Sequence, residues 1–353
     1  MKLYAKYISW VYIKYFLIVF VALEFFYVGI DVLTNLKDFP QSANLAILYV
    51  CLTAVVAVSY ILPLSLVLAM IIMGINLIRS NELVSFYALG TSKNTLVLAP
   101  FLIALTITLF YIIANATPFV YAWNYRQGLA GLQDRDEMGK EIFLKFENKF
   151  IYVDRLFADA SIAKNIKIFE VDEDGLKREI TASEGDFEDG KWNLKNVKIL
   201  TLPKTLDLNK SGYKVESSSG EEILEGFKPK TIENIYQNAS SGSISDNLAS
   251  LFLLWNENVS TTKIRSNLYS LTFFPLFAPL MVLIIYYYFP ITGRFASLAL
   301  TSFIFVLATL FVWGGFYILA RFSQNGVIYP EFGIVFPIFA LATFAWFKFY
   351  KNR

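Results

Sequence analysis

The sequence contains no histidine and only one cysteine, Cys51. Without histidine, the chain lacks the commonest metal ligand and the commonest general base. A single cysteine excludes both a disulfide within the chain and a cysteine-based zinc site. The net charge is only +2, so bulk charge does not indicate a nucleic-acid partner. These absences argue against metal-dependent and histidine-dependent catalysis and predict no metal site.

Long apolar segments are what the sequence does have, because hydrophobic residues make up 56% of it. A helix that crosses a bilayer core requires about 20 mostly apolar residues. Six segments meet this requirement and predict six membrane spans, at about 10–33, 45–78, 95–118, 268–289, 295–320 and 330–349. No small-residue cleavage site follows the first segment, so we expect a retained span there rather than a signal peptide.

The basic residues of the short loops predict the orientation of these spans. They lie before or at the start of the first span, in the second connection, between the fourth and fifth spans, and at or after the end of the sixth: Lys2, Lys6, Lys14, Arg79, Lys93, Arg294, Lys348, Lys351 and Arg353. With six spans, all of them fall on one side. Both termini are therefore expected in the cytoplasm, with Lys37 and Arg321 as a minority on the opposite side.

The middle of the chain has a different character. Residues 120–265 contain many charged residues and no apolar segment long enough to span a bilayer. Residues 149–156 alternate between apolar and polar, and Asp174-Gly175 and Asp189-Gly190 are typical of hairpin turns. We therefore expect an extracytoplasmic β domain, a sandwich or jelly roll, between three spans in 1–119 and three in 266–353.

One segment of this domain imitates a phosphate-binding loop. GDFEDGKW, residues 185–192, has the spacing G-x-x-x-x-G-K, but Trp192 replaces the serine or threonine that would bind magnesium. The acidic residues Asp186, Glu188 and Asp189 would also repel phosphates. A hairpin turn is the better interpretation, and it leaves the chain with no visible nucleotide site.

The polar connection between the second and third spans reads as a short helix at about 80–91. Its apolar face has helical spacing, with Leu83, Phe86, Tyr87 and Gly90 at i, i+3, i+4 and i+7. Glu82 places a negative charge in the first turn, and Gly90 suits the left-handed residue that ends a helix. A helix lying on the membrane is one reading, but the polar face has few basic residues. A helix that docks onto a cytoplasmic partner fits better.

Three ionisable residues near the spans are candidates for a binding role. Glu24 lies within the first span and Asp31 at its end, where charged groups are costly and often functional. Arg126 follows the third span. Asp31 could simply be interfacial, and Arg126 could simply anchor the chain at lipid headgroups. Alternatively, the Arg126 guanidinium could bind a phosphate or carboxylate of a lipid.

The whole chain resembles the LptF/LptG (YjgP/YjgQ) family, the permease subunits of the bacterial lipopolysaccharide-export ATP-binding cassette transporter. The most specific similarity is RSNELVSFYALGTSK at 79–93, which is similar to the coupling helix of the family. Pro118 and NYR at 124–126 resemble the end of the third span, and 147–156 resembles an early β-domain strand of LptG in particular.

The resemblance implies a multi-pass inner-membrane protein that serves outer-membrane biogenesis. It implies a heterodimer with an LptF-like permease, two copies of an LptB-like ATPase, and LptC/LptA-like jelly-roll proteins in the periplasm. The ATPase would use ATP and magnesium, and this chain would bind no cofactor and catalyse no reaction. Lipopolysaccharide would pass from the inner membrane to a periplasmic bridge that adjoins a jelly-roll-like domain.

The resemblance also implies roles for particular residues. Those of ATPase coupling would be Glu82, Leu83, Val84, Phe86, Tyr87 and Gly90, and those of lipopolysaccharide binding would be Arg126, Lys37, Asp31 and Glu24. Asp31 departs from the family pattern, because a lysine often stands there and faces the lipid phosphates. Two other classes stay open: an envelope scaffold that holds a periplasmic domain without moving substrate, and a membrane-embedded enzyme, which the composition disfavours.

Overall fold

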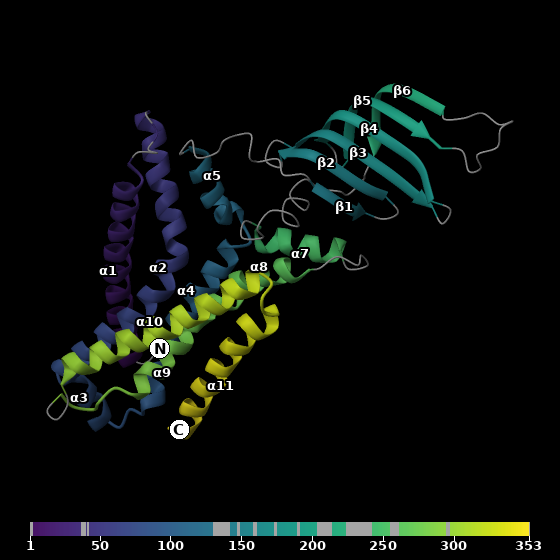
Figure 1. Ribbon diagram of the computed structural model, residues 1–353. Helices are drawn as coiled ribbons and strands as arrows, with labels where there is room; N and C mark the ends of the chain where they lie inside the picture. Colours follow the sequence, from purple (N-terminus) through teal and green to yellow (C-terminus); the bar gives the residue numbers. More distant parts are fainter. Residues whose placement is uncertain are drawn as a thin grey trace. The chain divides into compact units, whose positions relative to one another are not determined.

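The computed structural model describes residues 3–36, 40, 42–129, 142–146, 149–157, 161–172, 175–188, 191–202, 214–223, 242–254, 261–293 and 297–352 (Figure 1). The chain forms two compact units. The helical unit comprises Met1–Ala130, Ser243–Ser245 and Arg265–Arg353, and the sheet unit comprises Gly131–Gly242 and Asp246–Ile264.

Six helical segments in the described part of the chain are long and apolar enough to cross a membrane, which confirms the six predicted apolar helices. Four are α1 (Leu3–Thr34), α2 (Ala43–Arg79), α4 (Lys93–Ala114) and α10 (Leu298–Gln324). The fourth segment in chain order joins α8 (Thr262–Thr272), the 3₁₀ turn η3 (Phe274–Leu276) and α9 (Phe277–Tyr287). The last joins the π-helical turn η4 (Glu331–Val335) to α11 (Phe336–Lys351).

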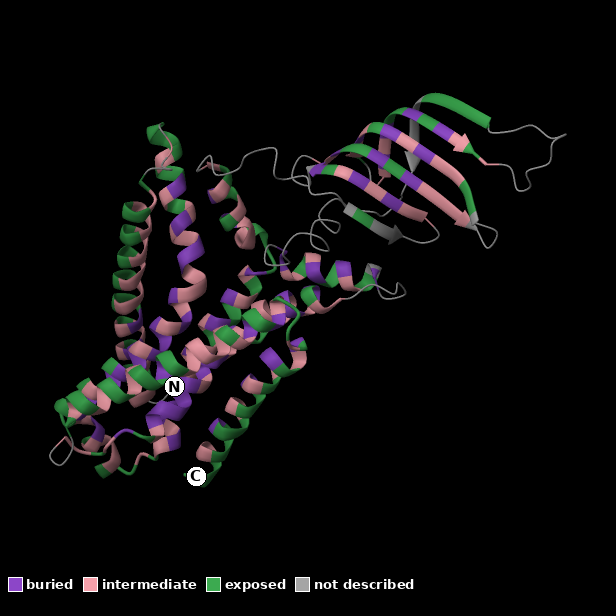
Figure 2. Cartoon of the chain, viewed as in Figure 1, coloured by how far each residue is buried: buried purple, intermediate pink, exposed green. Residues whose placement is uncertain are grey.

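Helices α2 and α9 form the centre of the helical unit. Almost every residue of α9 is buried, as are most residues in the second half of α2 (Figure 2). The segment that follows α9 packs so closely on α2 that a Cβ atom at Gly74 would overlap the ring of Phe289. Helix α1 joins this core through Tyr12, whose hydroxyl donates a hydrogen bond to the Leu66 carbonyl at 2.9 Å. The apolar character of α9 therefore reflects burial within the bundle.

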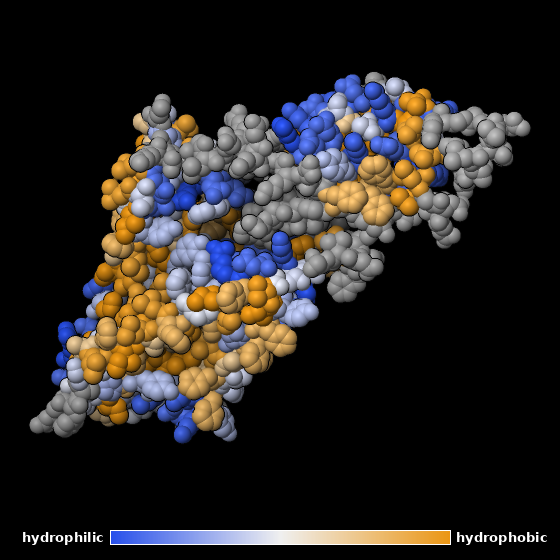
Figure 3. Space-filling view, in the orientation of Figure 1, coloured by the Kyte–Doolittle hydropathy of each residue, from blue (hydrophilic) through white to orange (hydrophobic). Residues whose placement is uncertain are grey.

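The outward faces of the helical unit are apolar as well. Trp10, Phe25 and Phe311 are 70%, 76% and 84% exposed, and apolar side chains form a broad band over the helices (Figure 3). Contiguous apolar surface of this extent is typical of a membrane or a protein interface. Together with the length of the helices, it supports the membrane-spanning assignment.

Three shorter helices connect the spans or extend them. They are α3 (Glu82–Ala88) between α2 and α4, and the 3₁₀ turn η2 (Pro118–Tyr121) with α5 (Ala122–Leu129) after α4. The Thr117 hydroxyl accepts a hydrogen bond from the Phe119 amide, so a new helical turn begins at Pro118. The sequence predicts a β domain that starts at about residue 120, whereas the chain up to Ala130 belongs to the helical unit.

The sheet unit contains one antiparallel six-stranded sheet in the order β1-β2-β3-β4-β5-β6 (Figure 1). The strands are β1 (Ile142–Phe146), β2 (Lys149–Phe157), β3 (Ile162–Asp172), β4 (Gly175–Glu188), β5 (Lys191–Thr201) and β6 (Lys214–Ile223), and α7 (Ile244–Leu253) follows them. Alternating residues such as Ile151, Ile168, Ile180 and Leu194 are fully buried and form its core. A β domain between the third and fourth spans is thus confirmed.

The connections of this sheet are hairpins. Asp172 pairs with Gly175, and Glu188 pairs with Lys191. Gly175 is therefore already part of β4, while Asp174, Asp189 and Gly190 lie outside the described residues. A jelly roll contains Greek-key crossings, whereas the described strands follow one another as a meander. The jelly-roll-like fold stays a prediction.

Candidate functional site

Helix α3 begins with an abrupt change of direction. Asn81, its N-cap residue, has a φ of 56°, and asparagine tolerates this left-handed conformation better than most residues. The Asn81 amide donates to the Ile78 carbonyl at 3.1 Å, which ties the turn to the end of α2. Glu82 occupies the first turn, where the helix dipole favours an acid. The chain therefore passes from α2 into α3 with almost no loop.

The end of α3 is equally well defined. Gly90 has a φ of +80°, the left-handed conformation that its position in the sequence predicts. The Thr91 amide donates to the Phe86 carbonyl at 3.1 Å, and the Gly90 amide donates to the Tyr87 carbonyl at 3.0 Å. This pair of bonds is a Schellman motif, which satisfies the last carbonyls of a helix. Both ends of α3 are thus held by backbone geometry.

Side chains attach α3 to α1. The Tyr7 hydroxyl of α1 donates a hydrogen bond to a Glu82 carboxylate oxygen at 2.7 Å. The Tyr7 ring lies against the Phe86 ring, with centroids 6.3 Å apart. Leu83 is 3% exposed and belongs to the helical core, while Val84 is half-buried. The sequence pattern indicates Glu82 and Phe86 but not Tyr7, because nothing in the local pattern links positions 75 residues apart.

A second set of polar contacts joins α3 to the other helices at the same end of the unit. The Tyr87 and Tyr286 hydroxyls lie 3.1 Å apart, and the next residue, Tyr287, donates to Asn94 Oδ1 at 2.7 Å. Asn94 Nδ2 in turn donates to the Phe349 carbonyl at 2.9 Å. We call these five residues the tyrosine–asparagine network. Burial raises the pKa of the Tyr87 hydroxyl, which therefore stays protonated and able to donate at neutral pH.

The network connects α3, α4, α9 and α11. Asn94 is only 7% exposed, and both ends of its amide are bonded. One signal for this network is visible in the sequence, because Tyr286, Tyr287 and Tyr288 stand together at the end of an apolar span, where hydroxyl groups need polar partners. Its members other than Tyr87 were not among our predicted site residues.

A groove runs beside α3. It has a volume of about 970 Å³ and lies between the start of α1, the end of α3 and the start of α4. Trp10, Phe86, Gly90 and Thr95 line it, together with Lys6. Leu89, also in its wall, is 81% exposed. The surface between α1, the end of α3 and the start of α4 is thus open and largely apolar.

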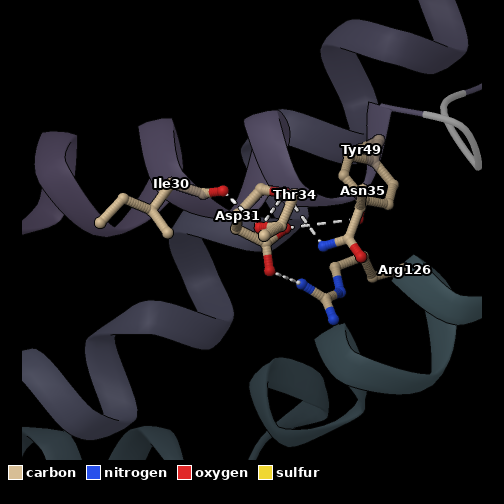
Figure 4. A network of polar contacts seen from close by, with 6 residues as sticks. All are labelled: Ile30, Asp31, Thr34, Asn35, Tyr49 and Arg126. Atoms are coloured by element: carbon tan, nitrogen blue, oxygen red, sulfur yellow. Dashed lines mark hydrogen bonds and ion pairs between the residues drawn. The ribbon is translucent and has the colours of Figure 1, made fainter.

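A separate polar cluster surrounds the C-terminal end of α1 (Figure 4). Arg126 of α5 points toward Asp31 of α1, and its Nη1 lies 2.9 Å from Asp31 Oδ1. The Tyr49 hydroxyl of α2 donates to the other carboxylate oxygen of Asp31 at 3.3 Å. The Asn35 side chain donates to the Asp31 carbonyl at 2.9 Å. Three helices therefore meet at Asp31.

Aromatic rings hold the Arg126 guanidinium in this cluster. Its central carbon lies 4.5 Å from the centre of the Trp123 ring and 5.7 Å from that of the Tyr49 ring. The side chains of Arg126 and Asp31 are only 10% and 14% exposed. A guanidinium stacked on aromatic rings and partly removed from water binds anions more strongly than an exposed one does.

The predicted lipid-binding residues thus divide into three groups. Asp31 and Arg126 are brought together and pair with each other. Glu24 lies seven residues before Asp31, on the same face of α1, and its carboxylate oxygens are buried without a hydrogen-bond partner among the described residues. Lys37 lies outside the described residues. In the described part of the chain, no group of three or more acidic or cysteine side chains could hold a metal ion.

Comparison with known proteins adds the family. No curated protein matches the chain. Residues 6–351 match the family described as the lipopolysaccharide export system permease LptF/LptG, a match that spans nearly all of the 353 residues. The chain belongs to the LptF/LptG family of lipopolysaccharide export permeases.

Proposed function

We propose that the chain is the LptG-type permease subunit of an ATP-binding cassette transporter, which extracts lipopolysaccharide from the inner membrane and passes it to a periplasmic jelly-roll bridge. Its partners would be an LptF-like permease, an LptB-like ATPase dimer that uses ATP and magnesium, and LptC/LptA-like proteins. Both termini and α3 would lie in the cytoplasm, and the sheet unit, as part of a jelly-roll-like domain, in the periplasm. Family membership supports the export role.

The observation that carries the coupling role is the way α3 is held. A helix of seven residues cannot be stable by itself, so its position depends on its attachments. Glu82 attaches it to α1, and Tyr87 attaches it to α9. A push on α3 by a partner would therefore be transmitted to at least two spans. This arrangement suits a docking lever at the membrane surface.

The Glu82 carboxylate can accept hydrogen bonds from Tyr7 and from a partner protein at the same time. A carboxylate has about four acceptor sites on its two oxygens, and the Tyr7 hydroxyl takes one of them. The remaining sites suit the guanidinium of an arginine on the ATPase. Leu89 and the neighbouring groove present an apolar surface beside this acid. The docking surface we propose thus combines one charge with apolar area.

The substitution Glu82→Arg tests this function. It reverses the charge, and we expect the ATPase to be lost when the complex is purified and lipopolysaccharide export to stop. Tyr7→Phe is the matched control, because it removes only the hydroxyl that contacts Glu82 and should retain the ATPase. Normal export in the Glu82→Arg variant would contradict the proposal.

Addition of lipopolysaccharide to the purified complex separates a transporter from a scaffold. A transporter should change its rate of ATP hydrolysis when the lipid is added, since both ligands act on the same moving helices. An envelope scaffold should leave hydrolysis by its partner unchanged.

A further inference from the structure

In the polar cluster around Asp31, the group best suited to bind an anion is the Arg126 guanidinium. It is already paired with an anion of the chain itself, the Asp31 carboxylate. Arg126 has several N–H donors, and Nη1 is directed at Asp31 Oδ1. A lipid phosphate that approached this guanidinium would meet the Asp31 carboxylate. Two anions so close together in a poorly hydrated site repel each other strongly. Asp31 and a phosphate would therefore compete for Arg126.

The two partners of the pair are carried by different helices. The guanidinium is held by the Trp123 ring, from its own helix α5, and by the Tyr49 ring of α2. Neither ring belongs to α1, which carries Asp31. Movement of α1 could thus withdraw the carboxylate while the guanidinium keeps its aromatic support.

Helix α1 also reaches the docking helix. It runs without proline from Leu3 to Thr34, 32 residues, and so is about 48 Å long at 1.5 Å per residue. Near its first turn, Tyr7 is bonded to Glu82 of α3, and near its last turn, Asp31 is bonded to Arg126. One uninterrupted helix therefore links the two ends of the unit.

We propose that Asp31 is an internal counter-anion that competes with the phosphate group of a lipid for Arg126. When α1 withdraws Asp31, Arg126 accepts the phosphate; when α1 returns, Asp31 displaces it and promotes release. A phosphate monoester carries more charge and more acceptor oxygens than a carboxylate, so it can bind the Arg126 guanidinium while α1 is withdrawn. This inference rests on the proposed function.

A fixed clamp between α1 and α5 is the competing explanation, and it makes the opposite prediction. If the pair only stabilises the fold, its loss should leave lipid binding unchanged or weaken it. If Asp31 competes with phosphate, loss of its charge should strengthen binding, and only of lipids that carry phosphate. Asp31→Asn removes the charge and keeps the shape, while Asp31→Glu retains the charge.

The test uses the full chain, co-expressed with its partners and placed in lipid nanodiscs. The probes are purified lipopolysaccharide and the same material after removal of its lipid A phosphates. We expect Asp31→Asn to bind the phosphorylated form about tenfold more tightly, the effect of removing one competing charge-assisted bond. Binding of the phosphate-free form should not change, and Asp31→Glu should bind like the unaltered complex.

A second variant keeps the inference testable if Asp31→Asn fails to fold. Tyr49→Phe removes the hydroxyl that holds Asp31 Oδ2 and keeps the ring beside Arg126, so it should also tighten binding of the phosphorylated form, by a smaller factor. Equal or weaker binding of that form by both variants would overturn the inference and leave the proposed function standing. If the unaltered complex bound neither form, the proposed function itself would fail.

Discussion

Two residues with left-handed backbones stand at the ends of α3. Asn81 and Gly90, with φ values of 56° and +80°, stand at the start and end of α3. Between them the chain makes only two turns of helix, so a small change at either residue alters the direction of the whole segment. Backbone conformation at single residues therefore controls how α3 is presented.

Gly90→Ala should disturb this presentation. A Cβ at Gly90 meets no neighbouring atom, so the cost comes from the positive φ alone and is about 1 kcal/mol. We expect a lower thermal unfolding temperature and weaker retention of the ATPase during purification. Gly314→Ala in α10 is the control, since this helical glycine also has open space around it and alanine favours a helix. Equal behaviour of the two variants would contradict the prediction.

At the scale of elements, the short helix depends on its neighbours. Hydrogen bonds of Glu82 and Tyr87 hold α3 against α1 and α9, and Asn94 continues the connection to α4 and α11. Four of the six apolar segments therefore end at one connected set of polar side chains. Hydrogen bonds that are partly removed from water favour one arrangement of the helices over others.

Asn94→Leu tests what this network does. The substitution leaves the Tyr287 hydroxyl and the Phe349 carbonyl without this partner, and because both residues are only half-buried the cost is about 1 kcal/mol for each, the lower end of the range for an unbonded polar group. We expect ATP hydrolysis to continue while less lipopolysaccharide is transported for each ATP consumed.

Thr106→Val is the matched control for Asn94→Leu. The Thr106 hydroxyl bonds only to the Leu102 carbonyl of its own helix, α4, so its loss should not disconnect any two helices. The decisive measurement is the ratio of lipid transported to ATP hydrolysed in reconstituted vesicles. An unchanged ratio in Asn94→Leu would show that the network only stabilises the fold.

At the scale of the whole molecule, membrane orientation governs every role we propose. The docking helix can meet a cytoplasmic ATPase, and the sheet unit can meet a periplasmic bridge, only if they lie on opposite sides. The basic residues of the short loops predict this arrangement. Cys51 is the only cysteine, so a Cys51→Ser variant provides a cysteine-free background for labelling.

Two single-cysteine variants test the orientation in that background. Leu89→Cys lies at the end of α3 and Thr201→Cys at the end of β5, and both positions are exposed. A membrane-impermeant maleimide, added to cells with a permeabilised outer membrane, should label Thr201→Cys at once. Leu89→Cys should react only after the inner membrane is broken. The reverse result would refute the orientation and the docking role with it.

The sequence by itself determined the features that depend on neighbouring residues. Hydropathy predicted six apolar helices, alternation predicted strands in the middle of the chain, and Gly90 predicted the end of α3. Each of these follows from local length, periodicity or backbone freedom, so no distant contact is needed to infer it. The resemblance carried by residues 79–93 also led to the family that the comparison confirmed.

Only the tertiary structure decided which polar side chains meet. Asp31 and Arg126 are 95 residues apart, Tyr7 and Glu82 are 75 apart, and Tyr87 and Tyr286 are 199 apart. From sequence, Asp31 and Arg126 were separate candidates for lipid contact, and Tyr7 and Asn94 were no candidates at all. These pairings result from how the helices pack, because a side chain in a poorly hydrated bundle bonds to whatever polar group the packing brings within reach.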